Sequence, residues 1–361
     1  MHVAELWLTD VRSYESAHAE FGPGLTVIRG ANGIGKTNLI ESLAYLGTQR
    51  SFRGMPPDTM VRQGQESAVI RGRVQHDQRT LLVDCEISTR GRSRAQINGQ
   101  KVTRGRDLLE VLRTTVFAPD DLAIIKAGPA FRRRFLDDVM VARRPKLDAL
   151  RSEVEKILRQ RNALLKQARG RLSDDVEMTL AVWNDKLAAS GEELARERRS
   201  LLDAITPQVQ MLYTEVSDSE QTVDVRYRST WEQGELAAAL DAAREDELRR
   251  GVTLVGPHRD DLEVRLNDLP GRTHASQGEQ RSLALALKLG GHLAVSESIG
   301  QAPVLLLDDV FSELDHARAD ALVHALPPGQ VVLTTAGDVP ASVDVEQTLE
   351  ATTTGLHRAD G

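Results

Sequence analysis

The sequence has little cysteine, few aromatic residues and no long hydrophobic run. A single cysteine among 361 residues, Cys85, excludes an internal disulfide. No window approaches 18 uncharged apolar residues, so we expect no membrane span, and the first ten residues lack the basic and apolar segments of a secretory signal. These absences predict a cytoplasmic protein. With three Trp, four Tyr and six Phe, rows of stacking rings for single-stranded nucleic acid are not expected.

A general excess of positive charge is also absent. The chain has 46 Lys plus Arg against 53 Asp plus Glu, a formal charge of -7, which excludes a protein that coats nucleic acid over its whole surface. Residues 301–361 hold ten acidic and two basic side chains, so the remainder is nearly neutral. Residues 86–134 hold eleven basic and five acidic side chains. This stretch is either a local site for phosphates or a solvated basic face.

Hydrophobic periodicity predicts two regions of different character. Short apolar runs predict strands near residues 4–8, 25–28, 68–70, 81–83, 95–97, 222–227, 253–266, 304–307 and 331–334. Helices are expected at 37–46, 279–293 and 316–326, and a short polar tail after Asp338. Between residues 132 and 218, apolar residues spaced by three and four predict a helical hairpin, interrupted at Arg161 and broken at 170–175. We predict an α/β domain from 1–131 plus 250–361 and a helical lobe at 132–249.

A phosphate-binding loop follows the predicted strand at 25–28. The residues Gly30-Ala31-Asn32-Gly33-Ile34-Gly35-Lys36-Thr37 match G-x-x-x-x-G-K-[ST]. Glycines let backbone N–H groups curl around phosphate oxygens, and the N-terminus of the following helix adds partial positive charge. Lys36 is expected to reach the β- and γ-phosphates and Thr37 to ligate Mg²⁺. The pattern therefore predicts binding of a nucleoside triphosphate.

A second motif supplies carboxylates for the same chemistry. Leu305-Leu306-Leu307-Asp308-Asp309 is an apolar strand that ends in two acids, the form of a Walker B element. We expect Asp308 to hold Mg²⁺ and Asp309 to be the general base or to orient water. Two acids at the end of a strand also occur in solvated turns, but the phosphate loop favours the metal site.

A third element precedes the predicted helix at 279–293. The segment Ala275-Ser276-Gln277-Gly278-Glu279-Gln280 is a helix cap or a second anion site. Because the phosphate loop already serves the protein's own nucleotide, a second site implies a second molecule. Placed about 30 residues before the Walker B strand, the segment resembles the signature motif of ABC-type ATPases, in which Ser276 and Gly278 would contact the γ-phosphate of a partner's nucleotide.

Five ordered motifs make the chain similar to the RecF family, which is related to the heads of SMC and Rad50 proteins. The phosphate loop continues into Asn38, and Ser51-Phe52-Arg53 follows it. The other motifs are Pro119–Leu122 with Gly128–Asp137, Gly256–Leu262, Ser276–Arg281 and Leu307–Asp315. The resemblance covers almost the whole chain. It implies an ABC-type P-loop ATPase head with a short helical-hairpin lobe, a nucleotide site that includes Asn38, and the cofactors ATP and Mg²⁺.

The same resemblance implies a function in DNA metabolism. It predicts an ATP-dependent homodimer with weak, DNA-stimulated ATP hydrolysis that binds gapped DNA and single-strand/double-strand junctions. The family cooperates with RecO and RecR to load RecA, in repair, recombination, replication and the SOS response. Two alternatives stay open: an ATP-gated DNA-binding module with vestigial hydrolysis, and another SMC/Rad50-like ABC ATPase. A transporter ATPase subunit shares the nucleotide motifs but has no place for the segment 119–137.

Three positions depart from what ABC-type ATPases commonly carry. Asp309 stands where many have Glu, which fits slow hydrolysis. Thr334-Thr335-Ala336 offers no switch histidine, so Thr335 is the candidate sensor of the γ-phosphate. The loop at 119–122 lacks the glutamine that many relatives place near Mg²⁺.

The predicted contacts to DNA are phosphate contacts without base reading. The candidates come from the basic stretch, and they are Arg90, Arg92, Arg94, Arg104, Arg106, Arg132, Arg133 and Arg134. For the run 132–134, local pairing with carboxylates such as Asp137 and Asp138 is an equal alternative.

Overall fold

The computed structural model describes residues 1–76, 78–217, 219–313, 316–337, 339–340, 342–352 and 355–358. The chain forms two compact units. The first unit contains Met1–Leu122, Gln208–Glu220 and Ser276–Gly361, and the second contains Ala123–Pro207 and Gln221–Ala275. Four residues that the sequence analysis used, in a motif or in the charge count, lie outside the described residues: Leu314, Asp315, Asp338 and Asp360.

An antiparallel sheet forms one layer of the first unit. Its strand order is β2-β1-β4-β5-β6-β7. The strands are β1 (His2–Val11), β2 (Tyr14–Glu20), β4 (Ser67–His76), β5 (Arg79–Ser88), β6 (Arg94–Ile97) and β7 (Gln100–Lys101). β1 and β4 alternate buried and more exposed side chains over much of their length, as expected for a sheet with one face on a core.

A second, mostly parallel sheet carries the phosphate loop. Its order is β15-β14-β3-β13-β12-β8, and all neighbours are parallel except β14 and β15. Its central strands are entirely or largely buried, because they read as continuous apolar runs. The strands are β3 (Leu25–Arg29), β8 (Thr114–Phe117), β12 (Val304–Asp308), β13 (Val331–Thr335), β14 (Gln347–Thr352) and β15 (Gly355–Arg358).

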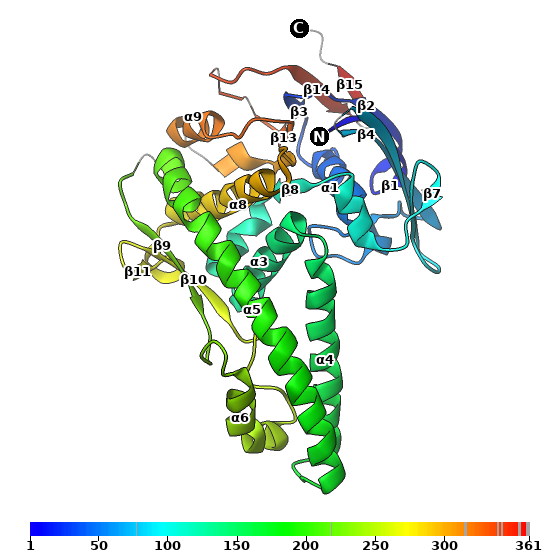
Figure 1. Cartoon of the computed structure of the whole chain (residues 1–361). Helices are drawn as coiled ribbons and strands as arrows, with labels where there is room; N and C mark the ends of the chain where they lie inside the picture. The colour runs from blue at the N-terminus through cyan, green and yellow to red at the C-terminus, as the bar shows by residue number, and fades with distance from the viewer. Residues whose placement is uncertain are drawn as a thin grey trace. The chain divides into compact units, whose positions relative to one another are not determined.

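Helix α1 (Lys36–Thr48) packs between these two sheets. Its residues Leu39, Ile40, Leu43 and Leu46 are fully buried and join apolar side chains of both sheets in one core. Figure 1 shows α1 beside β1 and β4. The remaining helices of this unit are η1 (Pro57–Met60), η2 (Gly105–Glu110), η3 (Pro119–Leu122), α8 (Gln277–Ile299), η4 (Val310–Glu313) and α9 (His316–His324).

The second unit is built on long helices. α4 (Leu147–Ala168) and α5 (Asp174–Ser217) run side by side in Figure 1, and α5 continues past Pro207 into the first unit. The unit also holds a small sheet of order β11-β10-β9. Its other elements are α2 (Ala123–Lys126), α3 (Pro129–Arg143), β9 (Val223–Arg228), α6 (Leu236–Arg250), β10 (Asp261–Leu266), β11 (Leu269–Pro270) and α7 (Gly271–His274).

The interruption of the apolar pattern at Arg161 is a buried ion pair. Arg161 has no exposed side-chain surface, and its guanidinium donates to Glu247 Oε2 at 2.6 Å, Asn184 Oδ1 at 2.9 Å and Thr253 Oγ1 at 2.8 Å. Glu247 also accepts from the backbone N–H of Leu254 at 2.7 Å. A charged group in the apolar seam is tolerated because its donors are satisfied.

Most predicted elements are confirmed, and two are corrected. The strand predicted at 253–266 begins at Asp261, because residues 253–260 form a loop whose carbonyl and amide groups bond to side chains. The tail after residue 338 contains β14 and β15, whose short, polar-rich sequences gave no strand signal. The sequence gave no prediction for β2, β8 and α6.

The compact units do not follow the predicted boundaries at 131/132 and 249/250. Strand β10 pairs with β9 in full register, and residues 250–275 belong to the second unit. The end of α5, from Gln208, belongs to the first unit, where the Gln208 amide donates to Glu297 at 2.7 Å.

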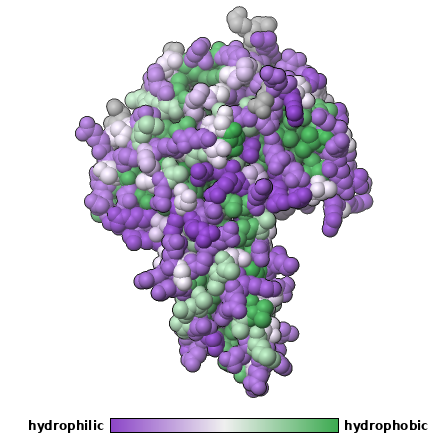
Figure 2. All heavy atoms as spheres, in the orientation of Figure 1, coloured by the Kyte–Doolittle hydropathy of each residue, from purple (hydrophilic) through white to green (hydrophobic). Residues whose placement is uncertain are grey.

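Hydrophilic residues cover most of the face drawn in Figure 2, and hydrophobic residues form small patches between them. Among the described residues, no helix is long and apolar enough to cross a membrane.

Replacing Arg161 by Met is expected to lower the free energy of unfolding by about 3–5 kcal/mol, because Glu247 would stay buried without its cation. Urea denaturation of the full chain measures this loss. Arg159→Met, at an exposed position of the same helix, is the matched control and should change stability by less than about 0.5 kcal/mol. Equal midpoints for the two variants would contradict a structural role for the ion pair.

Candidate nucleotide site

The loop at 30–37 connects the carboxyl end of β3 to the first turn of α1. Gly30, Gly33 and Gly35 all have positive φ, at 155°, 81° and 118°. At Gly35 a Cβ atom would lie 2.8 Å from both Ser13 Oγ and the Tyr14 hydroxyl, so the backbone passes too close for any side chain. At Gly33 nothing lies within 4 Å of the Cβ position, and Ala31, Asn32 and Gly33 are exposed. The loop is therefore closed toward the protein and open toward solvent.

The N-terminus of α1 presents an anion site inside this loop. Its N-cap is Gly35, which supplies no side-chain hydrogen bond, and the first turn contains no acidic residue. The first N–H groups of a helix lack partners within the helix, and the helix dipole adds positive potential there. A phosphate group satisfies both requirements.

The Lys36 side chain lies along the loop. It is buried, and Nζ donates to the carbonyl oxygens of Gly30 at 2.6 Å and Ala31 at 3.1 Å. The ammonium group is thus held beside the turn that a phosphate would enter. Asn38 Nδ2 donates to Ser13 Oγ at 3.0 Å, and the same oxygen lies beside Gly35 of the loop.

Thr37 and Asp308 meet although they are 271 residues apart. Thr37 Oγ1 donates to Asp308 Oδ1 at 3.0 Å, and Thr334 Oγ1 donates to the same oxygen at 2.8 Å. Burial raises the pKa of Asp308, and the two hydroxyls oppose that rise. A divalent cation would stabilise the charged carboxylate in this setting, and hydroxyl and carboxylate oxygens are the ligands that Mg²⁺ prefers. Thr37 and Asp308 therefore fit a Mg²⁺ site.

Asp309 adopts an unusual backbone conformation for a residue other than glycine, with φ at 49°. Its N–H donates to both the carbonyl and the hydroxyl oxygen of Thr334, at 3.1 and 3.0 Å, which fixes the turn after β12. Its Oδ1 is buried and has no hydrogen-bond partner among the described residues. A left-handed residue with an unsatisfied carboxylate oxygen is typical of a functional site.

The signature-like segment begins α8 with a capping box. Ser276 Oγ accepts from the N–H of Glu279 at 3.3 Å, and Glu279 Oε2 accepts from the N–H of Ser276 at 2.6 Å. The Ser276 hydroxyl keeps its own proton, which is available to a further acceptor. A Cβ at Gly278 would collide with the guanidinium of Arg318, so a larger residue at this position would require Arg318 to move. Arg281, in the same helix, lies close enough to Asp309 for that carboxylate to oppose the lowering of its pKa by burial.

Two residues near Asp308 were not predicted from the sequence. Thr334 contacts Asp308 directly, whereas the hydroxyl of Thr335, the candidate sensor, is used in a local turn with Gly337. Arg53 acts on Asp308 through its charge and lies 3.8 Å from the buried Glu41. Thr334 lies opposite Asp308 in the parallel pairing of β12 and β13, and this register is not visible in the sequence pattern.

The loop that lacks glutamine is held by a charge pair. Asp121 accepts from the N–H of Ala118 at 2.9 Å and from Lys288 Nζ of α8 at 2.9 Å. The loop at 119–122 is thereby fixed to the helix that begins with Ser276.

The basic candidates for DNA contact divide by exposure. Arg90, Arg92, Arg94 and Arg104 are exposed near the β5–β6 turn and β7, and Arg106 is half-buried. Arg90 forms an ion pair with Glu66 at 2.8 Å in which both side chains are largely exposed. Such a pair contributes little to stability and exchanges easily for a phosphate.

The run 132–134, whose three arginines are candidates for DNA contact, does not lie at the surface as a whole. Arg132 is buried, with two nitrogens on the Asp261 carboxylate at 2.7 and 3.0 Å. Arg133 donates to the Asp260 carbonyl at 2.7 Å and is half-buried. Arg134 remains exposed, 3.6 Å from Asp138. Arg132 and Arg133 are thus held by Asp261 and the Asp260 carbonyl rather than by Asp137 or Asp138, and Arg134 is the residue of the run that lies beside Asp138.

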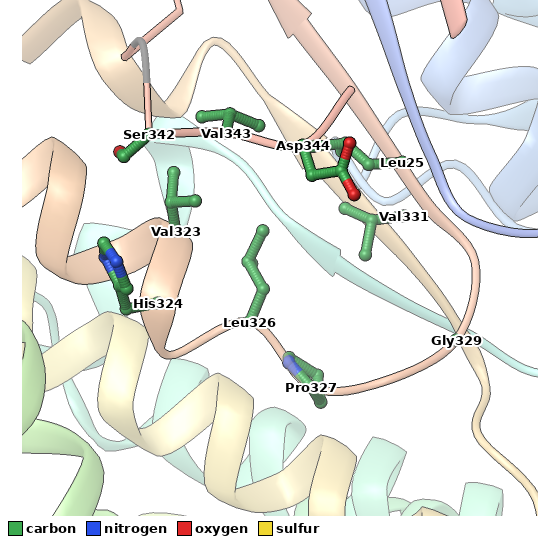
Figure 3. A pocket seen from close by; sticks show the side chains of 10 residues that line it. All are labelled: Leu25, Val323, His324, Leu326, Pro327, Gly329, Val331, Ser342, Val343 and Asp344. Carbon is green, nitrogen blue, oxygen red and sulfur yellow. The ribbon is translucent and has the colours of Figure 1, made fainter. Parts of the chain in front are cut away.

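A cavity of about 300 Å³ lies elsewhere in the first unit (Figure 3). Most of its lining residues are apolar residues of α9, β13 and the segments that follow them. The polar residues His324, Ser342 and Asp344 also line it. None of the predicted site residues lines it. Because the cavity and the candidate nucleotide site share no residue, they are separate sites.

Comparisons with known proteins agree on one family. The family model described as the RecF/RecN/SMC N terminal domain matches residues 2–336. The DNA replication and repair protein RecF of Streptomyces avermitilis is 42% identical over 359 residues, covering 94% of this chain and 95% of that protein. The protein of the same name from Acidothermus cellulolyticus is 42% identical over 353 residues, with 94% and 95% covered.

Solved structures give the same result. A structure of the recombination mediator protein RecF with ATP, from the RecFOR pathway, is similar with a TM-score of 0.90 and 28% identity, covering 99% of this chain and 98% of that one. The Smc head domain of Pyrococcus furiosus, at a TM-score of 0.58 and 16% identity over 99% and 96%, shares the fold. The architecture is that of an ABC-type ATPase head with a helical insertion, and the chain belongs to the RecF family.

Proposed function

We propose that the chain is an ATP-dependent DNA-binding protein of DNA repair, recombination and replication. The observation that carries this proposal is the hydrogen bond between Thr37 and Asp308, which brings the phosphate loop and the Walker B strand into one site. The RecF relatives, named for DNA replication and repair, and the ATP complex of a similar RecF structure support it.

The finer proposal follows the family. The protein acts at gaps and single-strand/double-strand junctions and cooperates with RecO and RecR in loading RecA, with a role in SOS induction. It functions in the cytoplasm as an ATP-dependent homodimer.

The roles of the residues follow from their positions. The first turn of α1 and Lys36 hold the phosphates, and Thr37 with Asp308 hold Mg²⁺, which would neutralise phosphate charge. Asp309 orients or deprotonates the attacking water through its unsatisfied carboxylate oxygen. Because its side chain is one methylene shorter than Glu, we propose slow, DNA-stimulated hydrolysis.

The second anion site requires a second copy of the chain. The Ser276 hydroxyl and the backbone at Gly278 stand at the start of α8 with a proton and N–H groups to donate. In a two-fold dimer each copy would place these groups on the γ-phosphate of its partner's ATP. Bound ATP then stabilises the dimer, and the basic surface of the dimer binds DNA.

Asp308→Asn is expected to raise the stability of the ligand-free protein by about 1 kcal/mol, because burial opposes the charged form of Asp308. The same change should abolish the stabilisation that Mg²⁺ and ATP give the parent. Thermal unfolding with and without Mg²⁺ and ATP measures both effects.

The matched control for this variant is Asp344→Asn, because Asp344 is exposed. It should leave both quantities unchanged. A variant at position 308 that is still stabilised by Mg²⁺ and ATP as strongly as the parent would contradict the metal role.

Ser276→Arg should prevent dimerisation on ATP, because the larger cation would occupy the place of the partner's γ-phosphate. Sedimentation with and without ATP measures the dimer, and nucleotide binding to the monomer should persist. The control Ser298→Arg makes the same change at an exposed position near the other end of α8 and should dimerise normally. Full dimerisation of both variants would rule out the two-site model.

DNA affinity should fall steeply with salt, since phosphate contacts release counterions. Replacing both Arg92 and Arg94 by Ala should lower the slope of log affinity against log salt by about 2. Fluorescence anisotropy over a salt series measures the slope, with Arg79→Ala, exposed at the opposite end of β5, as the control. Binding that survives about 0.5 M salt would count against this surface.

A further inference from the structure

Phe131 is an exception among the aromatic side chains. The structure describes every Phe, Tyr and Trp of the chain, and Phe131 is the one that is exposed, at 49%. Its neighbour in the motif, Phe135, is buried at 6%. An exposed phenyl ring gains nothing from the core, so the position of Phe131 needs another explanation.

The backbone under Phe131 is held firmly. The next residue, Arg132, donates to Ile124 O at 3.2 Å and Ala127 O at 2.8 Å, besides its two bonds to Asp261. One residue further, Arg133 bonds to the Asp260 carbonyl. These bonds fix the first turn of α3 to α2 and to the start of β10. The ring therefore projects from a rigid support rather than from a loose loop.

Two exposed basic side chains belong to the same short segment as Phe131. Arg134 lies three residues further along α3, so both side chains are on one face of the helix, and its side chain is 50% exposed. Its ion pair with Asp138, at 3.6 Å between half-exposed groups, is weak enough to give way to a phosphate. Lys126, at the end of α2, is exposed. The first turn of α3 contains no acidic residue.

An exposed aromatic ring next to exposed cations has the chemistry that binds an unpaired nucleotide. A base stacks on the ring and the cations neutralise the adjoining phosphates. In the interior of a duplex, both faces of a base are already stacked on their neighbours, so away from duplex ends the ring can engage only a base that is unpaired. The chemistry thus discriminates between DNA with and without a single-stranded region.

We propose that Phe131 is a stacking platform for one unpaired base of bound DNA, with Arg134 and Lys126 contacting the flanking phosphates. The proposal rests on the DNA binding proposed above and adds a structural basis for selecting DNA with an unpaired segment.

The test compares two DNAs of equal length, a duplex with a single-stranded gap and a complete duplex, bound by the full chain with Mg²⁺ and ATP. Phe131→Ala should bind gapped DNA about tenfold more weakly and change duplex affinity by less than about twofold. Phe131→Trp should restore gapped-DNA binding, whereas Phe131→Leu, which keeps an apolar side chain without a ring, should not.

Two further variants separate stacking from charge and from general surface effects. Arg134→Ala should weaken binding of both DNAs by a similar factor and lower the salt slope by about 1. Leu269→Ala, at a side chain that is also 49% exposed and in the same unit, should bind both DNAs as the parent does.

The outcomes distinguish this proposal from the function on which it rests. If the parent binds both DNAs and Phe131→Ala binds the gapped one equally well, the stacking platform is wrong and DNA binding stands. Rescue by Leu as complete as rescue by Trp, or an equal loss on both DNAs, would also overturn it. If the parent binds neither DNA, the proposed function fails.

Discussion

The oxygen Oδ1 of Asp308 is the point at which the nucleotide site is assembled. It accepts hydrogen bonds from Thr37, at the start of α1, and from Thr334, on β13. These groups come together because β3, β13 and β12 are parallel neighbours, so that their carboxyl ends share one edge of the sheet. Apolar runs bury these strands from both sides, and burial in turn raises the pKa of Asp308. The packing that forms the sheet therefore also disfavours the charged form of Asp308, and a bound cation would stabilise that form.

The sequence predicted the parts of this site that depend on local chemistry. A loop of the form G-x-x-x-x-G-K-[ST] requires its glycines, its Lys and its hydroxyl wherever it occurs, so Lys36 and Thr37 could be identified without a structure. Thr334 could not, because its role arises from the register of two strands. The charge interaction between Arg281 and Asp309 likewise depends on how α8 packs. Tertiary neighbours of a motif are invisible to its pattern.

Two of the motifs that mark the family are joined by ion pairs and hydrogen bonds. Arg132 and Arg133 of one motif hold Asp261 and the carbonyl of Asp260 of the other. Arg198 links both motifs as well, because it pairs with Asp137 at 2.7 Å and donates to the carbonyl of Pro257 at 2.7 Å. Charge counting placed this stretch in a basic surface, since composition cannot tell a buried ion pair from an exposed cation. Arg161, read only as an interruption of a helical pattern, was missed for the same reason.

The order of strands in the mostly parallel sheet has a consequence for the synthesis of the chain. β3 is made among the first 30 residues, but its two neighbours, β13 and β14, are made after residue 330. Both edges of β3 stay open while the ribosome completes the rest, whereas β9 and β10 of the second unit follow each other within 45 residues. Pairings that are distant in sequence form slowly and expose strand edges in the meantime. The mostly parallel sheet, with the nucleotide site at its edge, can therefore close only after residues beyond 330 have been made, and until then the edges of β3 are open to pairing with other chains.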